Sequence, residues 1–472
     1  MLNKFRKVSS SPGFLLLSFA ITAVALLGDQ ALAMPCMICL AMIIALVLFL
    51  NDDLFPTLLP FLCILLIGTT MIGGLEFVLP YIPFGIPAVL GFLFHLIAYR
   101  RPFRGGTSLP GLFATSAAIL LGGSGVVATQ QAIFNGAAAY HLIGLSLGLL
   151  FCYYLFATNP RPGRSYDPIK YFLLVMLLLG MLCATLTLSN FLSWILPAVR
   201  EGKVPLALDY LTGFIYRNTI ANLLIMCLPA GFYFAGIREA SLAQKVGSLL
   251  LGGFMFFALL LTCARTALLF GSILFVLCLI YYLWAPISWR TKLIGLSVLL
   301  ITGLVLFLIF RETIYSLLFE RLEHGLVLKK EPRFLLLKRS IEDFRSYPIF
   351  GIGLDSTANH DLYDASAAQG CITWYHMYFP QLWGSMGLFG MIAFAYQLVL
   401  RIKIILTKPD YQSMGLTLSY LGLFLYSQTD PGEFIPLPFA FLAVLIFVLL
   451  ENRNKKNAPL RIDPPRRSGW HE

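Results

Sequence analysis

Two arginines of this 472-residue chain stand in unusual apolar surroundings. Arg265 interrupts the apolar run from Leu259 to Phe270, with no other charge nearby. Arg217 precedes another apolar run and is followed by Asn218, which can cap a helix. Ionisable residues in such places face a cavity or a partner by default, and an arginine beside a helix N-terminus suits a phosphate group. The alternative for both arginines is an interfacial anchor whose charged head reaches the lipid headgroups.

A histidine lies in the aromatic stretch from Trp374 to Trp383, just before a further apolar run. A neutral imidazole accepts a proton from a hydroxyl near neutral pH, so His376 is a candidate general base. The alternative is that the tyrosines and tryptophans form an aromatic belt at a membrane surface. In that case the histidine is one more amphipathic ring.

A basic amphipathic stretch lies upstream of the histidine, over residues 334–344, and a turn at Gly351 and Gly353 follows it. Its basic residues recur at helical spacing, which predicts either a solvated face or a basic wall over a cavity. Gly-x-Gly without a strand before it and a helix after it does not by itself indicate a phosphate loop. The possible substrate-binding residues of this segment are Arg333, Arg339 and Asp355.

The composition shows which elements must carry these residues. The chain is 58% hydrophobic and only 12% charged, whereas soluble domains are about half apolar and a quarter charged. A soluble globular enzyme, a disordered protein and a disulfide scaffold are therefore excluded. Of nine cysteines only Cys371 lies in a polar loop, so we expect neither a disulfide framework nor a zinc site.

Apolar runs long enough for a membrane recur along the chain, since a span needs about 20 apolar residues. Several runs are short, so the sequence predicts an all-α polytopic membrane protein with about 12–14 transmembrane helices. One long, partly helical extracytoplasmic loop interrupts them. The fourteen candidate spans lie near 13–30, 35–50, 54–74, 84–99, 108–133, 138–157, 170–195, 218–236, 246–264, 267–286, 293–310, 382–400, 413–429 and 437–450.

The distribution of basic residues predicts the orientation. With the N-terminus inside, most of the 34 Lys and Arg fall in cytoplasmic segments, and none falls in four short outside connections. This is the positive-inside pattern, and it accounts for the net charge of +11 without nucleic acid. The predicted regions are N-terminal transmembrane helices (1–195), an extracytoplasmic loop (196–217), central transmembrane helices (218–310), a large extracytoplasmic loop with the catalytic region (311–381), C-terminal transmembrane helices (382–450) and a basic cytoplasmic tail (451–472).

The order of these motifs resembles the O-antigen ligase and O-antigen polymerase superfamily. The motifs are an arginine at the head of a mid-chain span, Ala-Arg-Thr at a hairpin, Pro-Ile-Phe-Gly-Ile-Gly in a long outside loop, and a histidine before Gly-Leu-Phe-Gly. Two positions depart from the family pattern: Met377 stands where Asn is frequent, and Ala264 stands where Ser is common. The resemblance covers roughly residues 213–400 and is strongest over 262–270, 347–355 and 374–390.

The resemblance implies a metal-independent glycosyltransferase with no cofactor. Such an enzyme moves a glycan from undecaprenyl diphosphate to an acceptor hydroxyl on the outer face of the cytoplasmic (inner) membrane, in cell-surface polysaccharide biosynthesis. It implies that Arg217 and Arg265 bind the donor diphosphate and that His376 activates the acceptor. The implied partners are the undecaprenyl-diphosphate-linked glycan donor, a glycan, lipid or protein acceptor, and membrane lipids, with no nucleic acid. Polymerase, ligase and protein glycosylation all remain open.

The main alternative is a lipid-linked glycan flippase or another multispan transporter, because many spans with buried cations suit a transporter too. A transporter holds its polar groups near the membrane midplane, whereas the two arginines and the histidine are predicted at outer ends of spans. We also find no internal repeat, and the single long loop is asymmetric. Both features favour the enzyme.

Overall fold

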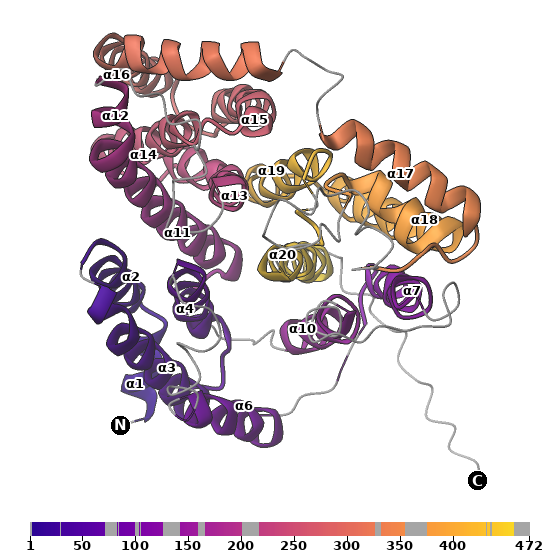
Figure 1. The fold of residues 1–472 in the computed structure, drawn as a ribbon. Helices are drawn as coiled ribbons and strands as arrows, with labels where there is room; N and C mark the ends of the chain where they lie inside the picture. Colours follow the sequence, from indigo (N-terminus) through magenta and orange to yellow (C-terminus); the bar gives the residue numbers. More distant parts are fainter. Residues whose placement is uncertain are drawn as a thin grey trace.

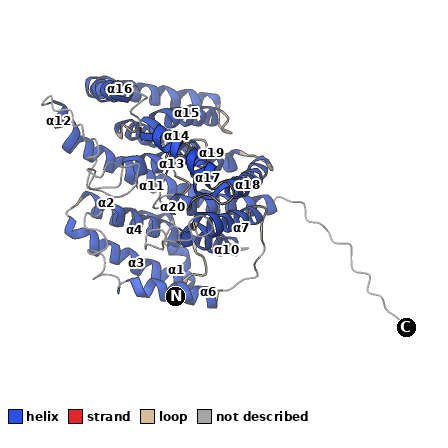
Figure 2. Cartoon of the chain, turned by 45° about the vertical axis from the view of Figure 1, so that its right-hand side comes forward, coloured by secondary structure: helices blue, strands red, loops and turns tan. Residues whose placement is uncertain are grey.

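The structure is a computed structural model that describes residues 2–28, 30–70, 83, 85–99, 103, 105–125, 142–158, 166–200, 217–325, 332–354, 375–430, 432–434 and 437–456. Within these ranges every regular element is a helix and none is a strand, as Figure 2 shows. The first helices are α1 (Leu2–Ser9), α2 (Pro12–Leu27), α3 (Ala33–Leu50), α4 (Leu58–Thr70), α6 (Ile86–Ala98), α7 (Leu109–Ala118), α10 (Leu149–Ala157), α11 (Pro168–Asn190) and α12 (Leu196–Arg200). The others are α13 (Arg217–Ala235), α14 (Leu242–Leu261), α15 (Arg265–Leu283), α16 (Trp289–Gly325), α17 (Pro332–Ser346), α18 (Tyr378–Leu406), α19 (Tyr411–Ser427) and α20 (Leu437–Lys456).

The helices confirm the predicted fold class of an all-α polytopic membrane protein. Each of the fourteen candidate spans overlaps a described helix. Over the described ranges, eight helices are long and apolar enough to cross a membrane, and five more are apolar but shorter. Two predicted loop boundaries lie inside helices. A π-helical turn, Phe191–Ile195, carries α11 into α12, so the predicted loop 196–217 begins with helix, and α16 extends into the predicted loop 311–381.

Helix α13 lies at the centre of a bundle with α11, α14, α15 and α19, all of which it contacts (Figure 1). In the span Asn218–Ala235 of this helix 83% of the residues are buried, against 6% in the apolar span of α16, which lies at the edge of the molecule. Glycines permit this density: a Cβ added at Gly231 of α13 would lie 2.7 Å from the Cα of Gly252 in α14. Small residues let helix backbones approach closely in membrane proteins, where packing rather than the hydrophobic effect drives association.

A break in α18 shapes the other side of the molecule. Gly387 has φ +62° and ψ −158°, which separates a first segment, 378–386, from a second, 388–406. The Pro-Ile-Phe-Gly-Ile-Gly segment runs across this break. The Leu388 N–H donates to the Pro348 carbonyl at 2.8 Å, and the Phe389 N–H donates to the Ile349 carbonyl at 3.0 Å. Because a helix break frees backbone groups, the crossing segment satisfies donors that α18 itself cannot.

Candidate functional site

Both candidate phosphate-binding arginines begin a helix. Arg217 is the first residue of α13 and Arg265 is the first residue of α15. Since α14 returns the chain between them, the two helices begin at the same end of the bundle. Their first turns present free N–H groups and partial positive charge, which favour an anion. Arg265 is exposed, and the side chain of Arg217 lies outside the described residues.

The turn before α15 is held by its own side chains. Thr262 donates its hydroxyl to the Leu259 carbonyl at 2.7 Å and accepts the Ala264 N–H at 3.3 Å. Cys263 between them has φ +50°, a conformation that non-glycine residues rarely adopt. Such strained residues concentrate at functional sites. The turn therefore fixes where α15 begins and where Arg265 stands.

His376 is held in a strained conformation between two anchored tyrosines. Its φ is +54°, and it is half-buried. The fully buried Tyr375 donates its hydroxyl to Asp343 Oδ2 at 2.6 Å and its N–H to Gln381 Oε1 at 2.9 Å. On the other side, the buried Tyr378 lies 5.5 Å, centroid to centroid, from Phe434. These contacts place the imidazole at the start of α18.

Charge and burial set the protonation state of His376. Burial, together with the nearby positive charge of Arg333, lowers the pKa of His376 to about 4. The imidazole is therefore neutral at neutral pH and can accept a proton.

Asp430 is a member of this cluster that sequence reasoning missed. It follows α19, and its Oδ2 accepts the amide N–H of Asn218, the residue after Arg217, at 3.0 Å. Burial raises the pKa of Asp430 to about 6, while the charge of Arg333 and the Asn218 hydrogen bond act to lower it. The charge of Arg333 thus influences the pKa of both Asp430 and His376. The starts of α13, α17 and α18 therefore lie near the end of α19. The available signal was an acid in a short connection that carries no basic residue.

Arg339, six residues further along α17 than Arg333, has a carboxylate partner. Its Nε lies 3.0 Å from Asp343 Oδ1, one helical turn away. Burial raises the pKa of Asp343, and its hydrogen bond from Tyr375 and the charge of Arg339 oppose that shift. Since Asp343 anchors Tyr375 beside His376, this pairing supports a role in positioning the histidine. A direct contact of Arg339 with substrate stays a prediction.

The Gly-x-Gly turn has a structural task. Gly351 has φ +68°, and a Cβ there would lie 2.3 Å from the Met386 nitrogen. The following N–H groups are already hydrogen-bonded to carbonyls, so they are not directed at a phosphate. The bonds are Ile352 N–H to Gly384 O (2.9 Å), Gly353 N–H to Ser385 O (2.9 Å) and Leu354 N–H to Gly123 O (2.6 Å).

Two further expectations remain untested. Asp355, a possible substrate-binding residue, lies outside the described residues. In the part of the chain that the structure describes, no three His, Cys, Asp or Glu side chains gather in a way that could hold a metal ion. Independence of a metal stays a prediction.

Comparison with protein families assigns the region that carries most of these residues. Residues 250–395 match the family described as O-Antigen ligase. A search of curated proteins and a search of solved structures found no match. The matched region includes Arg265, Arg333 and His376, while Arg217 and Asp430 lie outside it. The resemblance that the motifs indicated is confirmed over residues 250–395, where this chain is similar to the O-antigen ligase family.

Proposed function

We propose that the chain is a membrane glycosyltransferase that moves a glycan from undecaprenyl diphosphate to an acceptor hydroxyl on the outer face of the cytoplasmic membrane. One observation carries the proposal. His376, Arg333 and Asp430 form one electrostatic cluster, and Asn218 joins that cluster to the start of α13. A base, a cation and a carboxylate beside a helix N-terminus are the groups that transfer from a diphosphate needs.

The donor side uses permanent positive charge. The acceptor oxygen forms a bond to the anomeric carbon, and the bond between that carbon and the diphosphate oxygen breaks. Undecaprenyl diphosphate leaves with the negative charge that develops. Arg217 and Arg265 at the starts of α13 and α15 stabilise this charge, because a guanidinium stays ionised and can contact phosphate oxygens in pairs.

The acceptor side uses the histidine. His376 is neutral at neutral pH and takes the hydroxyl proton as the new bond forms. Ionised Asp430 lies close enough to Arg333 for their charges to interact, and it orients the Asn218 amide. In this scheme arginines take the place that a divalent metal holds in other glycosyltransferases, so neither a metal nor a cofactor is required.

The rival proposal is a flippase or another multispan transporter, and one observation favours it. The structure contains a buried ion pair, Arg401 with Glu433, inside the helix bundle, where a transporter keeps its polar groups. The adjoining cavity is only about 20 Å³, which holds about one water molecule, so the pair does not line a path for a glycan.

A deletion strain tests the two proposals against each other. The enzyme proposal predicts that the undecaprenyl-linked glycan accumulates on the outer leaflet, because flipping continues and transfer stops. Accumulation on the cytoplasmic leaflet would support the flippase instead. The accumulated species also shows whether the missing reaction is polymerisation, ligation to a lipid core or transfer to a protein.

A further inference from the structure

A pair of opposite charges is buried between α18, α19 and α20. Arg401 Nη1 lies 3.1 Å from Glu433 Oε1 and donates to the Tyr420 hydroxyl at 2.8 Å. Arg401 and Glu433 are each 7% exposed. Arg401 follows the Gly387 break by about 20 Å of helix at 1.5 Å per residue.

Charges inside a membrane protein are costly and usually have a function. Two ions must leave water, and their mutual attraction often only offsets that penalty. The pair is therefore a poor way to gain stability, although it can specify one arrangement of the chain. The question is which segment it fixes.

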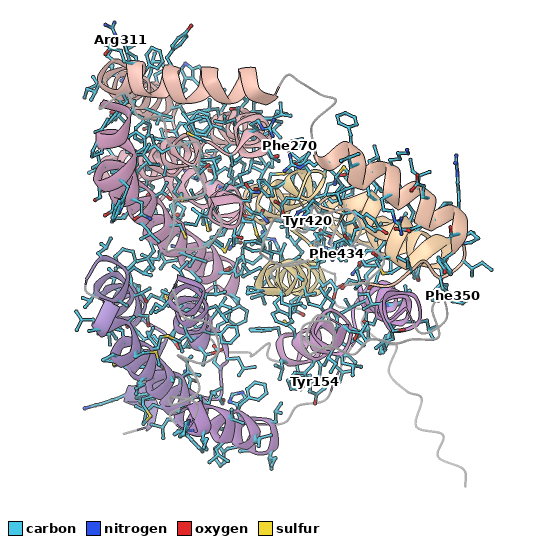
Figure 3. All side chains as sticks on the ribbon, viewed as in Figure 1. Tyr154, Phe270, Arg311, Phe350, Tyr420 and Phe434 are labelled. Atoms are coloured by element: carbon cyan, nitrogen blue, oxygen red, sulfur yellow. The ribbon has the colours of Figure 1, made fainter. Side chains whose placement is uncertain are left out.

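The segment is the connection between α19 and α20, of which residues 428–430 and 432–434 are described. Glu433 fastens it to α18 from within the bundle. Three residues earlier, Asp430 accepts the hydrogen bond from Asn218. One residue later, the ring of Phe434 lies 5.5 Å from the ring of Tyr378 and 5.4 Å from that of Phe394. Figure 3 shows Phe434 and Tyr420 near the centre of the molecule, among α18, α19 and α20.

The connection has little freedom to shift as long as this anchor holds. A Cβ added at Gly432 would lie 2.5 Å from the Asn222 amide nitrogen. Asn222 is buried in α13, one turn after Asn218. The connection thus packs against α13 at Gly432 and against the start of α18 at Phe434. Its position determines how far Asp430 and the segment of Tyr378 stand from each other.

We propose that Arg401 and Glu433 are positioning residues for the transfer reaction, because their ion pair fixes the α19–α20 connection in place. The fixed connection lets Asp430 accept the Asn218 hydrogen bond and lets Phe434 pack against Tyr378 beside His376. The inference rests on the proposed function, because its kinetic consequence requires that transfer occurs at this cluster. Its structural consequence, an anchored connection, does not depend on the reaction.

The decisive variant removes both charges, Arg401→Met together with Glu433→Met. A single substitution leaves one charge buried without its partner and endangers folding, whereas replacing both charges with apolar side chains is often tolerated. The matched control is Asp410→Asn with Arg453→Gln. That ion pair also joins α19 to α20, but at the opposite ends of these helices.

Two measurements on the purified full chain test the inference. Hydrogen–deuterium exchange of a peptide that covers residues 428–434 should rise about tenfold in the double-Met variant, because the anchor holds this segment closed. Glycan transfer should show a kcat about a hundredfold lower with a nearly unchanged KM for the lipid-linked donor, since the donor arginines stay in place. Arg401→Lys should fall between, because lysine keeps the charge but makes fewer contacts. The control should change neither quantity.

A double-Met variant that folds and exchanges at the wild-type rate would overturn the inference. Raised exchange with an unchanged kcat would overturn it too, because the anchor would then have no part in the reaction. If the wild-type chain transferred no glycan, the proposed function would fail, while faster exchange in the variant would still support the anchor.

Discussion

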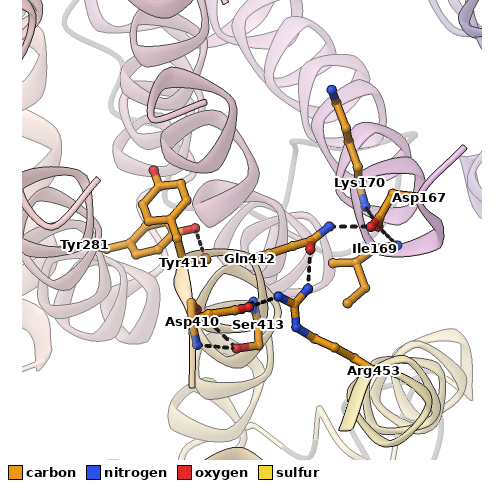
Figure 4. A network of polar contacts seen from close by, with 9 residues as sticks. All are labelled: Asp167, Ile169, Lys170, Tyr281, Asp410, Tyr411, Gln412, Ser413 and Arg453. Atoms are coloured by element: carbon orange, nitrogen blue, oxygen red, sulfur yellow. Dashed lines mark hydrogen bonds and ion pairs between the residues drawn. The ribbon is translucent and has the colours of Figure 1, made fainter. Parts of the chain in front are cut away.

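The polar side chains at the two ends of α19 differ in how they are paired and buried. Before α19, at the end expected to be cytoplasmic, polar groups pair with one another in a network (Figure 4). Asp410 pairs with Arg453 of α20, Arg453 donates to Gln412, and Gln412 donates to Asp167 before α11 at 2.7 Å. After α19, Asp430 and His376 are half-buried and have shifted pKa values, and the charge of Arg333 acts on both. The first arrangement joins helices, whereas the second keeps groups ready to exchange protons and bind anions.

This difference separates charged residues with a structural role from charged residues that are candidates for catalysis. Asp410 is an N-cap in a reciprocal capping box with Ser413, so its Oδ1 already accepts a backbone N–H, and its Oδ2 pairs with Arg453. Asp430 accepts from one side-chain amide, and burial raises its pKa to about 6. Perturbed pKa values in a cluster of this kind mark candidate functional sites. We therefore expect substitutions at the two ends to differ in kind, and the following predictions run from the largest expected effect to the smallest.

His376→Ala should lower kcat about a hundred- to ten-thousand-fold, the usual effect of losing a general base. Membrane insertion should be unchanged, because the neighbouring Tyr375 and Tyr378 keep their own anchors. Steady-state transfer with purified donor and acceptor measures the effect. A variant with the wild-type rate would move the base elsewhere, and Asp430 would be the first candidate.

Arg265→Ala should lower transfer about a hundred- to a thousandfold, the cost of losing one group that stabilises developing negative charge. Arg265→Lys should restore part of the rate, because lysine keeps the charge without the paired contact. Arg217→Ala should behave in the same way. Transfer at the wild-type rate in either Ala variant would show that this arginine does not bind the diphosphate.

Asp430→Asn should change the pH dependence more than the maximal rate. In the wild type, lowering the pH through about 6 protonates Asp430, and the rate should fall over that range. The variant has no carboxylate to protonate, so its remaining acidic limb should lie near the pKa of His376, about 4. The measurement is kcat against pH for both proteins. Superimposable profiles would exclude Asp430 from the reaction.

Gln412→Ala, in the network before α19, should leave kcat and KM unchanged. It removes hydrogen bonds to Asp167 and Arg453, and each such bond contributes about 1 kcal/mol to the free energy of unfolding. Thermal unfolding in detergent should therefore shift down by a few degrees. A loss of transfer larger than threefold in a well-folded variant would contradict the division between the two ends.

The fold was largely predictable because its main determinants are local. Runs of about 20 apolar residues predict spans regardless of their neighbours, and each predicted span overlaps a helix. The predicted spans do not show where a helix ends: α16 extends to Gly325, into the segment predicted as a partly helical loop. A hydropathy pattern has no signal for such an extension.

The site was only partly predictable, since its partners come together from distant segments. Arg265 and His376 stand out because charge or aromatic context sets them apart within a few residues. Asp430 becomes recognisable only when the fold brings it to Asn218, 212 positions away. The pairing of Arg401 with Glu433 was equally hidden, because Glu433 comes from the connection after α19, 32 positions away. Long-range pairing of this kind leaves no local pattern.

The most direct test is transfer by the purified chain in detergent, with undecaprenyl-diphosphate-linked glycan as donor, an acceptor and excess EDTA. Detergent removes the two compartments that a transporter needs, so only a reaction can release undecaprenyl diphosphate. We predict one undecaprenyl diphosphate released for each glycosidic bond formed, at the same rate with and without EDTA. Activity that disappears in EDTA and returns with magnesium or manganese would contradict the metal-free reaction, and no release under any condition would contradict the assignment as a transferase.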